Sequence, residues 1–250
     1  DTGAAVDLVG YVETELFDVV ENHPMITVHA LRRTSASDFI RRNRLLFVLH
    51  SVIRVLQDTV QLTWVLLFGP RSPDTVLVQN PPSVPTLLVA LVVARLRSAR
   101  YVIDWHNYGY SMIALRLGQR SPLVSLHQWL ERTCGGRADH HLCVSAAMRA
   151  QLTKRWGYVE PVVLYDRPAQ GFEPTAPELA RELLGRFRQE LELPATQCPP
   201  VWIVCPTSWT SDEEVSLLLE IAAQEHDPAM PDLFILITGK GPGQMAFERE

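Results

Sequence analysis

Several features that commonly mark functional sites are missing from this chain of 250 residues. Its four cysteines form no C-x-x-C pair, and no histidine stands at zinc-ligand spacing from them. The sequence also contains no D-x-D motif, a frequent metal-binding pattern, and no G-x-S-x-G hydrolase motif. We therefore expect neither a structural zinc nor a bound catalytic metal.

The chain also has no excess of positive charge and no long uncharged apolar run. Its net charge is −5, from 23 basic and 28 acidic residues, so a nucleic-acid partner has no overall electrostatic support. No signal peptide pattern stands at the first residues, and no window offers the roughly twenty apolar residues of a spanning helix. What remains is a globular composition, 47% hydrophobic and 20% charged, with ample material for a core.

Short apolar runs alternate with segments of helical period. Near-continuous apolar runs are typical of parallel strands that are covered on both faces. This pattern predicts an α/β fold with a mostly parallel sheet and helices on both faces. The expected strands are residues 6–11, 26–31, 75–79, 101–105, 140–144, 162–165, 201–205 and 233–238.

Helix ends have recognisable signals in three places. Ser145 is expected to cap a helix over residues 146–156 that Gly157 ends. Ser111 is expected to cap a shorter helix that Gly118 closes. Residues 211–214 (S-D-E-E) resemble a capping box, whose carboxylates would repel a phosphate from that helix end.

The segment between about residues 169 and 200 differs from its surroundings. It is proline-rich at both ends and charged in the middle, where residues 179–193 have helical period. We expect a first domain over residues 1–168, a connection over 169–198, and the opening of a second domain over 199–250. A single continuous domain is the alternative.

Residues 44–68 form an unusually apolar helical segment. A helix with such a broad apolar surface is either buried in a core or lies in a membrane interface. Arginines at positions 41, 42 and 44 stand just before it, where they could meet anionic headgroups. Docking against the sheet is the competing interpretation. The polar residues share one narrow arc: His50, Arg54, Gln57, Asp58 and Gln61.

Residues 102–111 (V-I-D-W-H-N-Y-G-Y-S) concentrate polar groups directly after an apolar strand. In open α/β sheets, residues just beyond a strand's carboxyl end line the ligand crevice. Asp104 and His106 lie two apart and point to one side, whereas Trp105 points away. Such a pair can position, deprotonate or charge-stabilise a hydroxyl. The alternative is a carboxylate that fixes a turn and a histidine satisfied by the backbone.

This run resembles the signature of the chitobiosyldiphosphodolichol β-mannosyltransferases, which add the first mannose to the lipid-linked N-glycan precursor. The resemblance covers nearly the whole chain, and its motifs stand in family order. The tryptophan–histidine run is the most specific of them, whereas Q-N-P-P and G-K-G-P are weak singly. The further motifs are residues 79–82 (Q-N-P-P), 142–145 (L-C-V-S) with 147–149 (A-M-R), 163–169 (V-L-Y-D-R-P-A), 207–210 (T-S-W-T) and 237–242 (I-T-G-K-G-P).

The resemblance implies a GT-B fold of two Rossmann-like domains, the second only partial here. It implies GDP-mannose as donor, a chitobiosyl diphosphodolichol acceptor and no cofactor. It also implies inversion at the anomeric carbon, which needs a single general base. The implied location is the cytosolic face of the endoplasmic reticulum membrane. The implied partners are the membrane surface and other glycosyltransferases of the pathway.

The family also has an N-terminal anchor, a first strand with a glycine-containing loop, and a longer donor domain. None of these is found in this sequence. We therefore expect a fragment that does not transfer mannose alone.

For catalysis, Asp104 is the first candidate for the base and His106 the second. The acceptor candidates are Asn80, Asn107, Tyr108 and Ser111, although Asn80 is better explained as part of a structural turn. Lys240 could neutralise a diphosphate charge or be a solvated lysine in a glycine turn. The donor candidates are Thr207, Ser208, Thr210, Gly239, Lys240 and Gly241.

Two other functions remain open on the sequence. A truncated, non-catalytic relative could hold the lipid-linked acceptor or a partner enzyme. A hydrolase using Asp104 and His106 is weaker, because no recognisable nucleophile setting accompanies them.

Overall fold

The computed structural model describes residues 3–12, 15–32, 43–69, 71–168, 172–193, 201–210, 215–223, 233–241 and 243–247. The arginines at positions 41 and 42, the capping box at 211–214 and Pro242 lie outside these residues. The chain divides into two compact units, Asp1–Asp166 and Arg167–Glu250, and each is described by itself.

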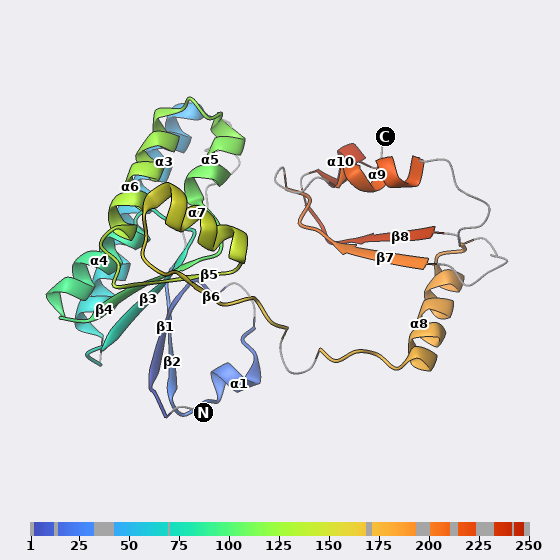
Figure 1. The fold of residues 1–250 in the computed structure, drawn as a ribbon, viewed down its shortest axis with the longest axis horizontal. Helices are drawn as coiled ribbons and strands as arrows, with labels where there is room; N and C mark the ends of the chain where they lie inside the picture. The colour runs from blue at the N-terminus through green and yellow to red at the C-terminus, as the bar shows by residue number, and fades with distance from the viewer. Residues whose placement is uncertain are drawn as a thin grey trace. The chain divides into compact units, whose positions relative to one another are not determined.

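A four-stranded parallel sheet organises the first unit (Figure 1). Its strands follow one another in sequence order, each paired with the next. They are β3 (Thr75–Asn80), β4 (Arg100–Trp105), β5 (His140–Cys143) and β6 (Val162–Val163). The carboxyl ends of these strands therefore lie along one edge of the sheet, where the site residues were expected. The predicted α/β class is confirmed.

Helices pack against this sheet and close its core. The helix α4 (Thr86–Leu96) contacts β3, β4 and α6 (Pro122–Gly135), while α7 (Ala146–Trp156) contacts β5 and β6. Tyr101, Ile103 and Trp105 of β4 are fully buried in the resulting core. Burial of such apolar surface is the main favourable term in folding.

The strands β1 (Val6–Gly10) and β2 (Ile26–Ala30) form a separate parallel pair, with α1 (Asp18–Glu21) between them in the chain. The expectation of one sheet through the first domain was therefore wrong, because β1 pairs with β2 and β3 with β4 without a described strand joining them.

Coverage on both faces holds for β4 but not for β3. In β4, Val102 and its two neighbours are all buried. In β3, exposed and buried residues alternate, and Leu77 is 58% exposed. Its continuous apolar run therefore misled the prediction, because only one face of this strand is covered by described residues.

Three of the predicted helix ends were right and one was wrong. Ser145 caps α7 by accepting a hydrogen bond from Met148 N, and Gly157 ends the helix in the left-handed conformation. The helix α5 (Gly109–Leu117) ends at Gly118 as predicted. Its N-cap is Tyr108, however, and Ser111 lies inside the first turn with its hydroxyl donating to Tyr108 O at 2.8 Å.

The helix α3 (Arg44–Phe68) has the predicted bounds. Its polar arc meets the ends of the small sheet: Asp58 accepts from the Tyr11 hydroxyl, and Gln57 and Gln61 donate to Arg32 O. Apolar residues at every fourth position form an outward-facing stripe along the helix, and they are 51–67% exposed. They are Val52, Leu56, Val60, Trp64 and Phe68. No helix in the described part of the chain is long and apolar enough to cross a membrane.

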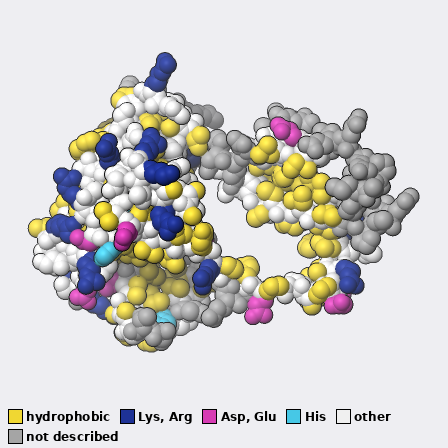
Figure 2. Space-filling model, viewed as in Figure 1, with side chains coloured by type: hydrophobic (Ala, Val, Ile, Leu, Met, Phe, Trp, Pro, Cys, Tyr) yellow, Lys and Arg dark blue, Asp and Glu magenta, His cyan; other side chains and the backbone are white. Residues whose placement is uncertain are grey.

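The second unit contains a β–α–β arrangement. Its strands β7 (Val201–Pro206) and β8 (Leu233–Thr238) are parallel and joined in the chain through α9 (Ser216–Ala223). It also holds α8 (Pro177–Glu190) and α10 (Gln244–Phe247), α8 starting two residues earlier and ending three residues earlier than predicted. Apolar side chains are visible on both units in the space-filling view (Figure 2).

Candidate active site

Asp104 and His106 stand at the carboxyl end of β4, with neighbouring strands on either side. The Nε2 atom of His106 lies 3.0 Å from Oδ2 of Asp104, within hydrogen-bonding distance. Their side chains are 32% and 20% exposed, so both can reach solvent or a ligand. The predicted shared orientation of these residues is confirmed.

Trp105, between them, points into the core as predicted. Its indole Nε1 donates to Nδ1 of His141 at 3.1 Å, and the His141 ring stacks on Tyr158 with centroids 4.4 Å apart. Burial lowers the pKa of His141 to about 4, so this imidazole is neutral near pH 7 and can accept a hydrogen bond from the indole N–H. His141, to which the sequence assigned no role, holds the end of β4 through Trp105, next to the Asp104–His106 pair.

Asp166 is a third polar residue beside this pair, and the sequence reasoning did not single it out. Its Oδ1 lies 4.0 Å from Nδ1 of His106, and its side chain is 75% exposed. The His106 ring therefore has a carboxylate near each nitrogen. The signal was available, because Asp166 follows β6 and the carboxyl ends of parallel strands share one edge.

Asn80 is fully buried and holds the loop after β4. Its backbone oxygen accepts from His106 N at 3.0 Å and from Asn107 N at 3.2 Å. Its side-chain amide donates to Asn107 O at 2.9 Å. These contacts fit the structural-turn interpretation better than a direct contact with an acceptor sugar.

The other acceptor candidates line the first turn of α5. The exposed Asn107 accepts from Tyr108 N at 2.9 Å through Oδ1. Tyr108 is half-buried and packs edge-on against Trp156, with centroids 5.1 Å apart. Burial raises the pKa of Tyr108 to about 12, so its phenol can donate a hydrogen bond but does not act as a base near neutral pH. Ser111 already donates to a backbone oxygen of its own turn.

Glu131 of α6 is a fully buried carboxylate that sequence reasoning missed. Its Oε1 accepts from the hydroxyl of Ser83 and, at 3.1 Å, from Tyr110 N. Charged residues are rarely buried unless they are paired. The burial of Glu131 could therefore not be predicted from the sequence, in which it is an isolated glutamate of an amphipathic helix.

The donor candidates come together at the carboxyl ends of β7 and β8. Trp209 donates from Nε1 to Gly239 O at 3.2 Å, and its backbone oxygen accepts from Gly243 N at 3.0 Å. Thr207 is buried and accepts from Trp209 N at 2.9 Å, whereas Ser208 and Lys240 are exposed and Thr210 is partly exposed.

These two loops approach so closely that glycine is required. A Cβ on Gly239 would collide with Thr207 O, and one on Gly241 would collide with Ser208 O. Gly239 also has φ of 104°, which favours glycine. The structure thus brings the six predicted donor residues into two adjoining loops.

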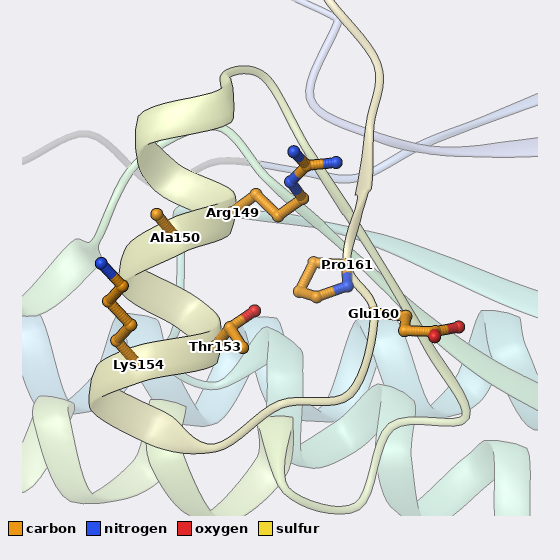
Figure 3. A pocket seen from close by; sticks show the side chains of 6 residues that line it. All are labelled: Arg149, Ala150, Thr153, Lys154, Glu160 and Pro161. Carbon is orange, nitrogen blue, oxygen red and sulfur yellow. The ribbon is translucent and has the colours of Figure 1, made fainter.

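An open hollow of about 550 Å³ lies elsewhere on the first unit, between α7 and the segment that leads into β6 (Figure 3). Its lining includes Arg149, Lys154 and Glu160, and neither Asp104 nor His106 contributes to it. Among the residues that the structure describes, no three His, Cys, Asp or Glu side chains gather as a metal site would require.

Comparison with known proteins identifies relatives along the chain. A sequence model of the glycosyl transferase 4-like domain matches residues 1–165. The chitobiosyldiphosphodolichol β-mannosyltransferase of Arthroderma benhamiae is 36% identical over 88% of this chain and 52% of its own length. The human protein of the same name is 31% identical over 99% of this chain and 59% of its own length.

The UDP-glycosyltransferase TURAN of Arabidopsis thaliana is 32% identical over 98% of this chain and 62% of its own length. The chain therefore spans about half to three fifths of the length of these curated relatives.

Proposed function

The chain belongs to the glycosyl transferase 4-like family, and from this premise we propose that it is part of an inverting β-1,4-mannosyltransferase. The donor would be GDP-mannose, and the acceptor a chitobiosyl diphosphodolichol. The names of the fungal and human relatives support the sugar and the acceptor class. The name of the Arabidopsis relative indicates a uridine nucleotide, so the choice of donor needs a direct test.

The hydrogen-bonded Asp104–His106 pair is the observation that carries this proposal. Inversion by one displacement needs a single base that removes the proton of the attacking acceptor hydroxyl. The pair stands at the carboxyl edge of a parallel sheet, where such folds bind ligands, and both side chains are partly exposed.

The geometry supports distinct roles for the two residues. His106 is the more exposed, and its Nε2 is already engaged by Asp104. Its Nδ1 is then the atom that can accept the hydroxyl proton, while the Asp104 carboxylate orients the ring and stabilises the imidazolium. This reverses the order that the sequence favoured, with the same two residues.

Departure of the nucleoside diphosphate requires stabilisation of negative charge. The loops of residues 207–210 and 239–241 offer backbone N–H groups, hydroxyls and the exposed Lys240 at one edge of the second unit. Backbone N–H groups in tight turns form anion-binding concavities, and a lysine adds a point charge. We assign these loops to the donor diphosphate, with no bound metal or cofactor.

A lipid-linked acceptor places the enzyme at a membrane surface, and α3 has a suitable face. Its outward stripe of apolar side chains resembles that of helices that lie in the interface plane. We propose that this stripe contacts the cytosolic face of the endoplasmic reticulum membrane. Other glycosyltransferases of the same pathway are the proposed protein partners.

Transfer assays with the full-length protein test this function. The purified protein is incubated with a chitobiosyl diphospholipid and either GDP-mannose or a UDP-sugar, and the lipid product is analysed by mass spectrometry. We expect one hexose added from GDP-mannose alone, in a linkage that β-mannosidase removes. Acceptor binding without transfer would instead support a non-catalytic binding protein, and transfer from the UDP-sugar would overturn the donor assignment.

A further inference from the structure

We propose that Glu131 is a positioning residue for this reaction, which sets the geometry of the two loops that follow β3 and β4, next to Asn80 and the Asp104–His106 pair. The inference rests on the proposed function for its catalytic consequence. The structural part, in which one buried carboxylate joins three segments of the chain, rests on the structure alone.

The contacts of Glu131 reach both loops from α6. Its Oε1 accepts from the hydroxyl of Ser83, which is 2% exposed and lies in the loop after β3. The same oxygen accepts from Tyr110 N, at the start of α5 and directly after the loop that contains His106. Each loop leaves a strand at one end, and the Glu131 carboxylate fixes the other end of the loop.

Gly109 shows that this approach is close. A Cβ at this position would collide with the Ser83 hydroxyl and would stand 2.7 Å from Glu131 Oε1. Its φ is not in the left-handed region, so backbone conformation does not explain this glycine. The glycine in the run D-W-H-N-Y-G-Y-S is needed because Glu131 and Ser83 occupy the space beside it.

Asn80 completes the link to the catalytic pair. Its side-chain amide donates to Asn107 O at 2.9 Å, and its backbone oxygen accepts from His106 N at 3.0 Å. In the described part of the chain, Asn80 Oδ1 and Glu131 Oε2 are buried without a hydrogen-bond partner. Burial raises the pKa of Glu131, against the hydrogen bonds from Ser83 and Tyr110 that lower it.

Substitutions at Glu131 in the full-length protein separate positioning from general stability. Glu131→Ala removes both contacts, while Glu131→Gln keeps an oxygen that can accept from Ser83 and from Tyr110 N. Cys134→Ala is the matched control, because Cys134 is buried on the same helix and belongs to the hydrophobic core. The measurements are kcat and KM per folded protein, and hydrogen–deuterium exchange of the backbone N–H groups of Asn80, Ser83 and residues 106–111.

We expect Glu131→Ala to lower kcat on the order of 10–100-fold, with KM for GDP-mannose within about threefold, because small displacements of reacting groups carry costs of this size. Exchange should rise in the two loops, and Glu131→Gln should restore most of the turnover. Cys134→Ala should lower the unfolding temperature and leave kcat and loop exchange unchanged.

Wild-type kcat in Glu131→Ala, or equal losses in Glu131→Ala and Cys134→Ala, would overturn the inference. If the wild-type protein transfers no mannose, the proposed function fails instead. Hydrogen–deuterium exchange of the two loops then decides the inference by itself. Unchanged exchange in Glu131→Ala would contradict the positioning role of Glu131 whatever the reaction is.

Discussion

Asp104 and His106 share one hydrogen bond, and the surroundings of each give it a different part in the proposed chemistry. The Asp104 carboxylate is the less exposed of the two side chains and contacts Nε2 of the His106 ring. The other ring nitrogen, Nδ1, lies 4.0 Å from Asp166. A histidine held by a carboxylate on one nitrogen is the usual arrangement of a general base, in which the carboxylate fixes the tautomer and stabilises the imidazolium.

Substitution of each residue tests this arrangement in the full-length protein. We expect His106→Gln to lower kcat on the order of 10²–10⁴-fold, the usual contribution of a general base. Asp104→Asn should also lower kcat, while KM for both substrates changes little. Asp166→Asn should lower kcat less than either, since its carboxylate is 4.0 Å from the ring and largely exposed. Near-normal turnover in His106→Gln with loss in Asp104→Asn would make Asp104 the base, as the sequence first suggested.

His141 should make the stability of the first unit depend on pH. Its pKa is lowered to about 4 in the folded chain, below the ordinary value of 6.5, because it is buried. The unfolded chain therefore binds this proton more readily, and folding stability falls as the pH drops from about 6.5 to about 4. The loss approaches about 1.4 kcal/mol per pH unit in that range.

Urea unfolding of wild type and His141→Gln at several pH values measures this contribution. The glutamine keeps an acceptor for Trp105 Nε1 but does not titrate, so the variant should lack this part of the pH dependence. Parallel stability curves for the two proteins between pH 7 and 4.5 would exclude His141 as the cause.

Among the elements, α3 shows how far a sequence pattern reaches. Its bounds and its polar arc were predictable from helical period, because both depend on residues close together in the chain. What the arc contacts was not, since Tyr11 and Arg32 come from distant segments. The same holds for β3: its apolar run predicted a strand, but only the three-dimensional packing decides that Leu77 is left exposed.

The outward stripe of α3 should bind anionic lipid. In the chain of 250 residues, Val52→Glu, Leu56→Glu and Val60→Glu together remove three exposed apolar side chains from the stripe. Each is worth about 1.5 kcal/mol or more when buried, so cosedimentation with vesicles containing phosphatidylserine should weaken at least about 100-fold. Leu46 of the same helix is partly buried and is left unchanged.

A matched variant gains the same three charges elsewhere on the first unit, as Leu115→Glu, Leu117→Glu and Val159→Glu at exposed positions. Its vesicle binding should stay within about threefold of wild type. Equal losses in both variants would show that added charge alone, rather than the α3 stripe, governs binding. Unfolding of the stripe variant would show that α3 is part of the core.

Across the whole molecule, some contacts of the candidate site are predictable from local sequence and others are not. The Asp104–His106 contact follows from a two-residue spacing along one strand, and the donor residues follow strands that are themselves apparent from sequence. Glu131 joins the site from 25 residues beyond His106, and the sequence contains no local pattern that places it there. Asp166 could have been placed, because it directly follows a strand that the sequence predicts. Long-range contacts of this kind depend on the order of strands in the sheet.

The assignment of acceptor chemistry to the first unit and donor binding to the second predicts separable effects on the two ligands. In the full-length protein, Gly241→Ala should push the loop of residues 239–241 away from Ser208 O, which a Cβ would meet. Calorimetry should show GDP binding at least about tenfold weaker, with acceptor binding unchanged. Gly185→Ala in α8 is the control, because a Cβ there meets nothing within 4 Å and alanine favours a helix. Equal GDP affinity in Gly241→Ala, Gly185→Ala and wild type would place the donor diphosphate away from these loops. Loss of acceptor binding in Gly241→Ala, with an unchanged unfolding temperature, would contradict the division between the units.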